Sequence, residues 1–419
     1  ATLYSKVVGE DHASYWSGVY KVGRFLSAIF DTLTVAMVFL IGRRIAGRRA
    51  GLYAAMIAAL TPMAIQLAHF WTTDSWLTFF VLMTIWLLLR AMDEGSRKSF
   101  ILAGISFGLA MATKGSVFTL AGLVAVAIVL AAWQRRDEFD RLIETIAWAI
   151  ERAMLAAFAS VFAFAIFEPY ALWQPDVYVD QLLNQSHIIS GSFDVPFTRQ
   201  YIGTLPIAYQ IEQVVRWGWG PVAGVLIFVG AFVLSKRLIR HPDPAGLLLI
   251  AWFVGYGIVI AVPETKFLRY LAPLIPVFAL MAGLAIEAIA DWFSRRNLKR
   301  MAVAVPAVLL LGVAFWTAAF MNVYAGTHPR IAASEWIYAN VPPGSVIQSE
   351  YWDDSLPLNL NASLNANAYS YTWDGFDFYA APPAPEAANA IFEQISQVDY
   401  IIMSSNRVSS AMPQSPWRY

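Results

Sequence analysis

The sequence has no cysteine and few charged residues. Because none of its 419 residues is cysteine, disulfides, thiolate nucleophiles and cysteine-bound metals are excluded. Charged residues make up only 14% of the chain, and the formal net charge is zero. No cluster of Lys and Arg alternates with aromatic residues as a nucleic-acid groove requires, so we expect no nucleic-acid partner. Gly-rich phosphate loops, Gly-x-Ser-x-Gly elbows and His-Glu-x-x-His helices are also missing, so soluble nucleotide chemistry is not indicated.

Apolar residues, in contrast, are abundant. They account for 58% of the chain, more than in an ordinary soluble domain. Ten apolar stretches approach the ~20 residues that cross a bilayer as a helix. They cover residues 24–42, 51–70, 75–92, 99–113, 116–133, 146–167, 217–234, 245–262, 270–290 and 302–321. The fold is therefore predicted to be mainly α, a polytopic transmembrane helical bundle, with a broken or re-entrant pair as the alternative for the two short stretches beside Lys114.

The loops between these stretches alternate in charge. Every second loop is basic, and the five basic loops contain Arg43, Arg44, Arg48 and Arg49; Arg90, Arg97 and Lys98; Arg135, Arg136 and Arg141; Lys236, Arg237 and Arg240; and Arg295, Arg296, Lys299 and Arg300. The positive-inside rule places all five in the cytoplasm and the other loops outside. Because the first stretch then runs inward from an outside N-terminus, we expect one more span upstream of Ala1.

The C-terminal part has the pattern of a small soluble domain. The segment HPRIAASEWIYANVPPGSVIQSEYWDD predicts a helix, a turn and a strand that begins at Val346. A second helix is expected near residues 386–397, and a strand in VDYIIMSSN. We therefore predict a membrane domain over residues 1–325 with an outer loop at 168–216. Residues 326–419 form an α/β domain on the non-cytoplasmic side, which we expect to continue past the end of this sequence.

A histidine and an aspartate interrupt two apolar stretches in AHFWTTDSWLTFF. These residues are His69 and Asp74, and they lie at the predicted outer ends of their spans. Ionisable groups at membrane depth are costly, so they mark candidate functional sites. A carboxylate and an imidazole suit Mg, Mn or Zn, so this pair is a candidate divalent metal site. The alternative is that Asp74 only caps the helix that follows it.

Three cations are predicted on the same side of the membrane. Lys114 lies in MATKGS, and Lys266 and Arg269 lie in PETKFLRYLAP. Such cations bind phosphate groups, or they anchor the chain by extending toward lipid headgroups. Two cations within four residues run against the positive-inside trend, which favours a phosphate ligand for Lys266 and Arg269. Glu168 begins a long aromatic outer segment that is expected to lie at the interface as a lid, and it is added to the substrate-binding candidates.

Several of these segments, in their order along the chain, resemble a known family. They are VGRFLSAIFDTLTVAMVFLIGRRIAGRRAGLYAA, HFWTTDSWLTFF, ATKGS, GSFDVPFTRQYIGTLP and KFLRYLAPLIPVFALMAG. The pattern resembles the lipid-carrier-dependent glycosyltransferases of the GT-C superfold, which include protein O-mannosyltransferases and the aminoarabinose transferase of lipid A. The later segments ASEWIYANVPPGSVI and VDYIIMSSNR resemble the outer domain of the bacterial members, so the resemblance covers most of the chain.

The resemblance implies a function and roles for the candidate residues. The implied enzyme moves a sugar from a polyprenyl-phosphate-linked donor to a protein, lipid or glycan acceptor on the outer face of a bacterial plasma membrane. Asp74 matches an acidic position that acts as a catalytic group or metal ligand. Lys114, Lys266 and Arg269 match positions that meet the carrier phosphate. The principal base is expected on a loop upstream, because Glu10 and Asp11 are poor matches to it.

Two other functions remain as alternatives. The chain could be a non-catalytic membrane subunit of a larger complex derived from the same fold, which would co-purify with fixed partners and transfer no sugar. A transporter of lipid-linked material is the third possibility. Paired broken helices in two related halves are typical of transporters, and the sequence shows no such repeat.

Overall fold

A computed structural model describes most of the chain. The described residues are 12–193, 195–350, 355–361, 363–365, 372–376, 389, 392–393 and 395–404. Contacts divide the chain into two compact units. One comprises Ala1–Ser186 and Leu205–Phe320, and the other comprises His187–Thr204 and Met321–Tyr419.

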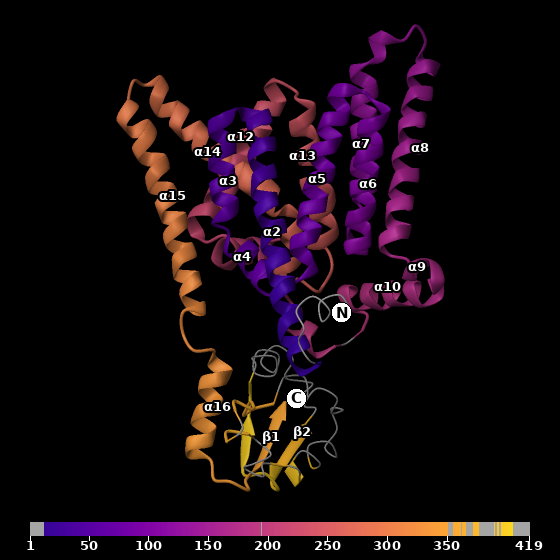
Figure 1. The fold of residues 1–419 in the computed structure, drawn as a ribbon. Helices are drawn as coiled ribbons and strands as arrows, with labels where there is room; N and C mark the ends of the chain where they lie inside the picture. The colour runs from indigo at the N-terminus through magenta and orange to yellow at the C-terminus, as the bar shows by residue number, and fades with distance from the viewer. Residues whose placement is uncertain are drawn as a thin grey trace. The chain divides into compact units, whose positions relative to one another are not determined.

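The first unit is a bundle of helices, as the sequence predicts (Figure 1). All ten predicted apolar stretches are helical. The helices are α2 (His12–Ala46), α3 (Arg48–Ala59), α4 (Pro62–His69), α5 (Thr73–Glu94), α6 (Arg97–Thr113), α7 (Leu120–Gln134), α8 (Leu142–Phe167), α9 (Tyr170–Trp173), α10 (Pro175–Ser190), α11 (Ala208–Gln213), α12 (Pro221–Arg240), α13 (Pro244–Ala261), α14 (Ile275–Arg295) and α15 (Lys299–Met321). A short 3-10 helix, η5 (Leu268–Leu274), leads into α14.

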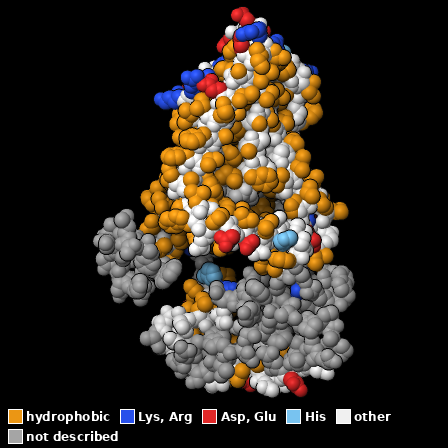
Figure 2. Space-filling model, turned by 90° about the vertical axis from the view of Figure 1, so that its right-hand side faces the viewer, with side chains coloured by type: hydrophobic (Ala, Val, Ile, Leu, Met, Phe, Trp, Pro, Cys, Tyr) orange, Lys and Arg blue, Asp and Glu red, His pale blue; other side chains and the backbone are white. Residues whose placement is uncertain are grey.

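The number of spans is smaller than the ten apolar stretches suggest. Within the described part of the chain, eight helices are long and apolar enough to cross a membrane, and α3 with α4 would make a ninth. Hydrophobic side chains cover much of the flank shown in Figure 2. The chain is therefore an integral membrane protein. α6 has 17 residues, so it is too short to be counted with the eight.

The broken pair is α3 and α4, not the pair beside Lys114. The two helices are bent by 51° relative to each other. Pro62 is the first residue of α4, and proline can neither donate a main-chain hydrogen bond nor fit beside the carbonyl four residues earlier. Beside Lys114, the helix that includes α7 spans 20 residues, Gly115–Gln134, and is itself long enough to cross the membrane.

The helices of the first unit place their connecting loops at two opposite ends (Figure 1). The end that carries Arg44, Arg97, Arg135 and Arg295 is called the basic end below. The end that carries residues 69–74, 113–120 and 261–268 is called the site end. The basic loops thus share one end, as their alternation along the sequence predicts.

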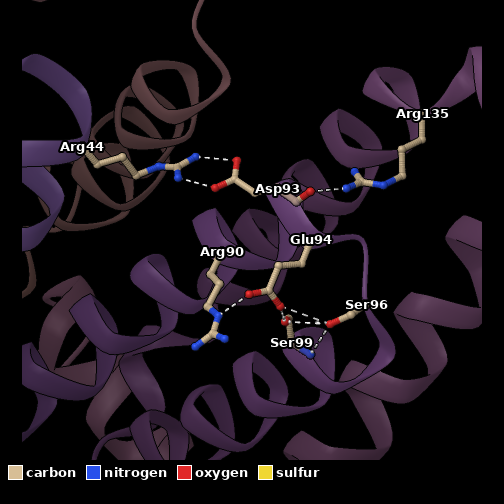
Figure 3. A network of polar contacts seen from close by, with 7 residues as sticks. All are labelled: Arg44, Arg90, Asp93, Glu94, Ser96, Ser99 and Arg135. Carbon is tan, nitrogen blue, oxygen red and sulfur yellow. Dashed lines mark hydrogen bonds and ion pairs between the residues drawn. The ribbon is translucent and has the colours of Figure 1, made fainter.

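A polar network joins four helices at the basic end (Figure 3). Arg44 of α2 forms a two-pronged ion pair with Asp93 near the end of α5. Arg135, which follows α7, donates to the main-chain oxygens of Met92 and Asp93, and so satisfies carbonyls that a helix end leaves free. Ser96 caps α6 by accepting from the backbone N–H of Ser99 at 3.2 Å. The network fixes these helix ends relative to one another.

Glycines bring several helices into direct backbone contact. A methyl group on Gly104 of α6 would overlap the main-chain oxygen of Ala156 in α8, and one on Gly230 of α12 would overlap that of Met281 in α14. Within membranes, such small residues let helices approach closely and gain van der Waals contact. These glycines therefore set the spacing of their helix pairs.

The second unit contains a helix and a small parallel sheet. The helix is α16 (Pro329–Asn340), and the strands are β1 (Val346–Glu350), β2 (Thr372–Phe376) and β3 (Tyr400–Ile402), in the order β2-β1-β3. The strand predicted to begin at Val346 and the one in VDYIIMSSN are confirmed. The helix expected near 386–397 lies partly outside the described residues. A small core contains Ile337, Tyr338, Val341, Ile347 and Leu356.

We predict that Gly104→Ala destabilises the bundle by about 1–3 kcal/mol, because its methyl group forces α6 away from α8. Gly122→Ala is the matched control, since Gly122 lies within α7 and has no atom within 4 Å of the added methyl group. The measurement is the free energy of unfolding in mixed detergent micelles. Equal losses in both variants would contradict the packing role of Gly104.

Candidate functional site

The centre of the candidate site is a buried ion pair at the site end. The Lys114 ammonium donates to Oδ1 of Asp74 at 2.9 Å, and the side chains of Asp74 and Lys114 are 4% and 29% exposed. A buried carboxylate is costly unless it is paired and hydrogen-bonded. The pair therefore explains how Asp74 is accommodated between apolar helices, and it joins residues that lie forty positions apart in the sequence.

The simpler interpretation, in which Asp74 is a helix cap, is wrong in its geometry. α5 begins at Thr73, so its N-cap residue is Thr72 and Asp74 lies inside the first turn. The carboxylate still lies in the first turn of α5, near the positive end of the helix dipole. Its hydrogen-bond partner, however, is the Lys114 ammonium that follows α6.

Two tyrosines complete the surroundings of the pair. The Lys114 ammonium lies 5.3 Å from the centre of the Tyr270 ring, within the range of a cation–π contact. Tyr256, buried in α13, donates its hydroxyl to the main-chain oxygen of Tyr270 at 3.0 Å. Trp252, stacked on Tyr256, donates to the main-chain oxygen of Pro273 at 3.1 Å. α13 thus holds η5 so that Tyr270 faces Lys114.

The other two candidate cations lie in and just before η5. Arg269 is exposed, and its guanidinium carbon lies 5.1 Å from the Phe267 ring centre and 6.0 Å from the Tyr270 ring centre. Lys114 and Arg269 therefore both lie near Tyr270. The structure thus brings together two cations that are 155 residues apart in the sequence.

Lys266 differs from Arg269 in being buried. It is 5% exposed, and its ammonium donates to the main-chain oxygen of Glu264 at 2.9 Å. Burial lowers the pKa of Lys266 below that of an ordinary lysine, and the charge of Glu264 opposes this only in part. Lys266 will therefore lose its charge at a lower pH than an exposed lysine.

Glu168 is linked to the site by Tyr178, a residue that the sequence analysis did not identify. Glu168 ends α8 and is partly buried. Burial, and then the negative charge of Glu168, raise the pKa of Tyr178 in α10. The Tyr178 hydroxyl lies 3.8 Å from the position of a Cβ atom on Gly115, beside Lys114. Tyr178 carries no motif that would identify it, whereas Tyr270 directly follows the conspicuous Arg269 and could have been noticed.

The predicted metal pair is not assembled as a ligand set. His69 is exposed at the end of α4 and packs edge-on against Phe70, with 5.5 Å between ring centres, whereas Asp74 is buried and bound by Lys114. The described parts of the chain contain no group of three His, Asp or Glu side chains that could hold a metal ion. These residues alone therefore do not fit a metal centre. Glu10 and Asp11 lie outside the described residues.

An aromatic cavity of about 620 Å³ lies next to the ion pair in the first unit. It includes Thr73 and Thr113, the sequence neighbours of Asp74 and Lys114. Trp76 stacks on Phe30 with 4.8 Å between ring centres and donates to the Ser27 hydroxyl at 3.2 Å. Trp76 and Trp71 therefore line a cavity in addition to lying near the expected membrane interface.

We predict that Lys114→Met lowers the free energy of unfolding by about 3 kcal/mol, because it leaves the Asp74 carboxylate buried without a partner. Asp74→Asn combined with Lys114→Met should restore most of this loss, since no buried charge remains. Lys98→Met is the matched control, because Lys98 is exposed at the opposite end of the same helix. The free energy of unfolding in mixed micelles is measured for the unaltered protein, Lys114→Met, Asp74→Asn, the double variant and Lys98→Met. Additive effects of the Asp74 and Lys114 substitutions would contradict the pairing.

Comparison with solved structures finds similar membrane proteins. One is the archaeal oligosaccharyltransferase AglB from Archaeoglobus fulgidus in complex with an inhibitory peptide and a dolichol-phosphate, at 15% identity and a TM-score of 0.49, covering 91% of this chain and 58% of that one. A structure of the Archaeoglobus fulgidus oligosaccharyltransferase in complex with Zn and sulfate has 16% identity, a TM-score of 0.45, and coverage of 92% and 56%. ArnT from Cupriavidus metallidurans bound to undecaprenyl phosphate has 14% identity and a TM-score of 0.45, with coverage of 90% and 75%. This chain therefore spans somewhat more than half the length of the AglB chains.

Comparison of sequences gives one family and no individual relative. No curated protein matches the chain. The family model for dolichyl-phosphate-mannose-protein mannosyltransferase matches residues 18–173. The resemblance predicted from the sequence is thus confirmed: the segment that carries Asp74, Lys114 and Glu168 matches the dolichyl-phosphate-mannose-protein mannosyltransferase family.

Proposed function

We propose that this chain is a membrane glycosyltransferase that moves a sugar from a polyprenyl-phosphate-linked donor to an acceptor. The observation that carries the proposal is the buried Asp74–Lys114 pair, which lies in the segment that matches the family. Arg269, from a later segment, lies close to Tyr270, as Lys114 does. A cation held in a protein site of low dielectric stabilises a phosphate more strongly than one in water. The pair therefore supports a phosphate-binding role.

The proposed reaction is a direct displacement at the anomeric carbon of the sugar. The acceptor oxygen forms a bond to this carbon as the bond from the carbon to the donor phosphate oxygen breaks. The acceptor proton passes to a base, which the family resemblance places on a loop before Asp74. The departing polyprenyl phosphate gains negative charge, so cations positioned at its oxygens lower the barrier most.

We assign the candidate residues to this reaction as follows. Lys114 and Arg269 bind the departing phosphate, and Lys266, from the segment just before Arg269, adds a third positive charge. Asp74 is a positioning residue, because its carboxylate already accepts from the Lys114 ammonium. Tyr178 lies beside the Lys114 turn, and it contacts the donor sugar or the acceptor together with Glu168, whose charge acts on it. These roles are assigned to side chains alone, because the described residues do not supply a ligand set for a divalent metal.

The same proposal places the protein in its membrane. Residues 1–325 form the membrane domain of a bacterial plasma-membrane protein, with the site end and residues 326–419 outside and the basic end in the cytoplasm. The donor is a lipid-linked sugar and the acceptor is a protein, lipid or glycan hydroxyl. Sugar transfer by the purified protein in liposomes, from labelled polyprenyl-phosphate mannose to a Ser/Thr peptide or to a lipid extract, tests it. A non-catalytic subunit would transfer no label to either acceptor.

For Arg269→Gln we expect kcat/KM for transfer to fall about 100-fold, because one charge at the leaving phosphate is lost. The side chain is exposed, so the unfolding midpoint should not change. Arg216→Gln is the matched control, because this exposed arginine, paired with Glu212, precedes α12 at the same end of the bundle. Full activity of the Arg269 variant would contradict its phosphate role.

The lowered pKa of Lys266 predicts a pH-dependent affinity for the carrier. As the pH rises through this pKa the ammonium loses its proton, so binding of undecaprenyl phosphate should weaken at a lower pH than an ordinary lysine would give. Lys266→Arg keeps its charge and should hold its affinity for the carrier to a higher pH. Binding isotherms across this pH range make the comparison. Identical profiles would show that Lys266 does not reach the phosphate.

A further inference from the structure

A polar cavity lies between α12 and α14 at the basic end, away from the candidate site. Its volume is about 460 Å³, and its charged lining consists of Arg237, Glu287, Asp291 and Arg295. The aromatic ring of Trp292 also lines it. Helix ends at this end of a membrane bundle lie at the level of the phospholipid headgroups. The cavity is therefore open to headgroups rather than to acyl chains.

The helix packing explains why the cavity opens there. α12 and α14 touch backbone to backbone where Gly230 meets Met281. The cavity is lined from Val233 to Arg237 on α12 and from Leu284 to Arg295 on α14, beyond this contact toward the basic end. The close approach of the two helices at Gly230 is therefore followed, toward the basic end, by the space that these residues line.

Both carboxylates of this cavity have an ion-pair partner, whereas its two lining arginines have none among the described residues. Arg49 of α3 binds both carboxylates, with its Nη2 at 2.9 Å from Glu287 Oε1 and 2.8 Å from Asp291 Oδ1. Across the described residues, the guanidinium groups of Arg237 and Arg295 form no ion pair. Three arginines and two carboxylates leave one net positive charge. The ligand that balances this set carries one negative charge, and Arg237 and Arg295 are placed to bind it.

One buried atom indicates a second property of the ligand. Glu287 Oε2 is shielded from solvent and has no hydrogen-bond partner among the described residues, although Oε1 of the same carboxylate is bound by Arg49. Buried carboxylate oxygens are rarely left without a donor. The ligand should therefore carry a hydroxyl or similar donor beside its negative charge.

We propose that this cavity binds an anionic phospholipid whose headgroup carries hydroxyls, of which phosphatidylglycerol is the simplest. Its phosphate lies between Arg237 and Arg295, and a glycerol hydroxyl donates to Glu287 Oε2. Its single negative charge balances the cavity, whereas the zwitterionic phosphatidylethanolamine would leave the positive charge unmatched. Basic pockets between membrane helices commonly hold anionic headgroups in this way. The site is independent of the proposed sugar transfer.

Native mass spectrometry of the full chain, exchanged between micelles of defined lipid, tests the proposal. We expect the protein to retain phosphatidylglycerol in preference to phosphatidylethanolamine and to phosphatidylmethanol, which has the same charge but no headgroup hydroxyl. Arg237→Gln and Arg295→Gln should each weaken phosphatidylglycerol binding about five-fold. Arg240→Gln, an exposed arginine one turn from Arg237 that does not line the cavity, is the matched control and should bind as the unaltered protein does.

Three results would overturn the proposal. Equal retention of phosphatidylglycerol and phosphatidylethanolamine would show that charge does not select the ligand. A loss in the Arg240 variant as large as that in the Arg237 and Arg295 variants would show general attraction to the surface. Displacement of the lipid by millimolar inorganic phosphate would show that the cavity recognises a free phosphate.

Discussion

The candidate site depends on one constraint, which is that the carboxylate of Asp74 is buried at the end of a membrane helix and must be paired. The Lys114 ammonium meets this requirement and thereby fixes the start of α5 against the turn after α6. Tyr270 lies against the same ammonium, and Tyr256 holds the backbone of Tyr270. The geometry of three separate elements thus follows from a single charge that cannot be left alone in a low dielectric.

The two ends of the bundle differ in how exposed their charged groups are. At the basic end, exposed arginines pair with Asp93, Glu287 and Asp291. Pairs in contact with water each contribute little to stability, so their main effect is to define where helices end. At the site end the charges are fewer and more buried, and aromatic rings surround them. Such surroundings strengthen electrostatic interactions, which is the property that binding a charged group requires.

Much of the fold could be predicted from the sequence, because hydropathy and the alternation of basic loops are local signals. The helices, their two ends, and the strands at Val346 and in VDYIIMSSN are of this kind. The break at Pro62 could have been predicted from the proline alone. The short length of α6 was also visible in the sequence, because the apolar stretch at 99–113 is one of the two short ones beside Lys114.

The individual members of the site were partly predictable, but their arrangement was not. Asp74, Lys114 and Arg269 stand out because charges are rare in apolar stretches. Their meeting at Tyr270 depends on how α5, α6 and η5 pack, which no pattern within one segment encodes. The proximity of His69 and Asp74 in sequence suggested a metal pair, yet the end of α4 leaves His69 exposed while α5 buries Asp74. Nearness in the chain therefore did not predict the partner of Asp74, which is Lys114, forty residues away.

The most direct test of the central claim is a structure of the full chain in lipid nanodiscs with undecaprenyl phosphate, determined by electron cryo-microscopy. The account predicts that the carrier phosphate lies within ion-pair distance, about 4 Å, of both the Lys114 ammonium and the Arg269 guanidinium, with Asp74 still bound to Lys114. A phosphate bound elsewhere on the bundle, with Lys114 contacting Asp74 alone, would contradict it.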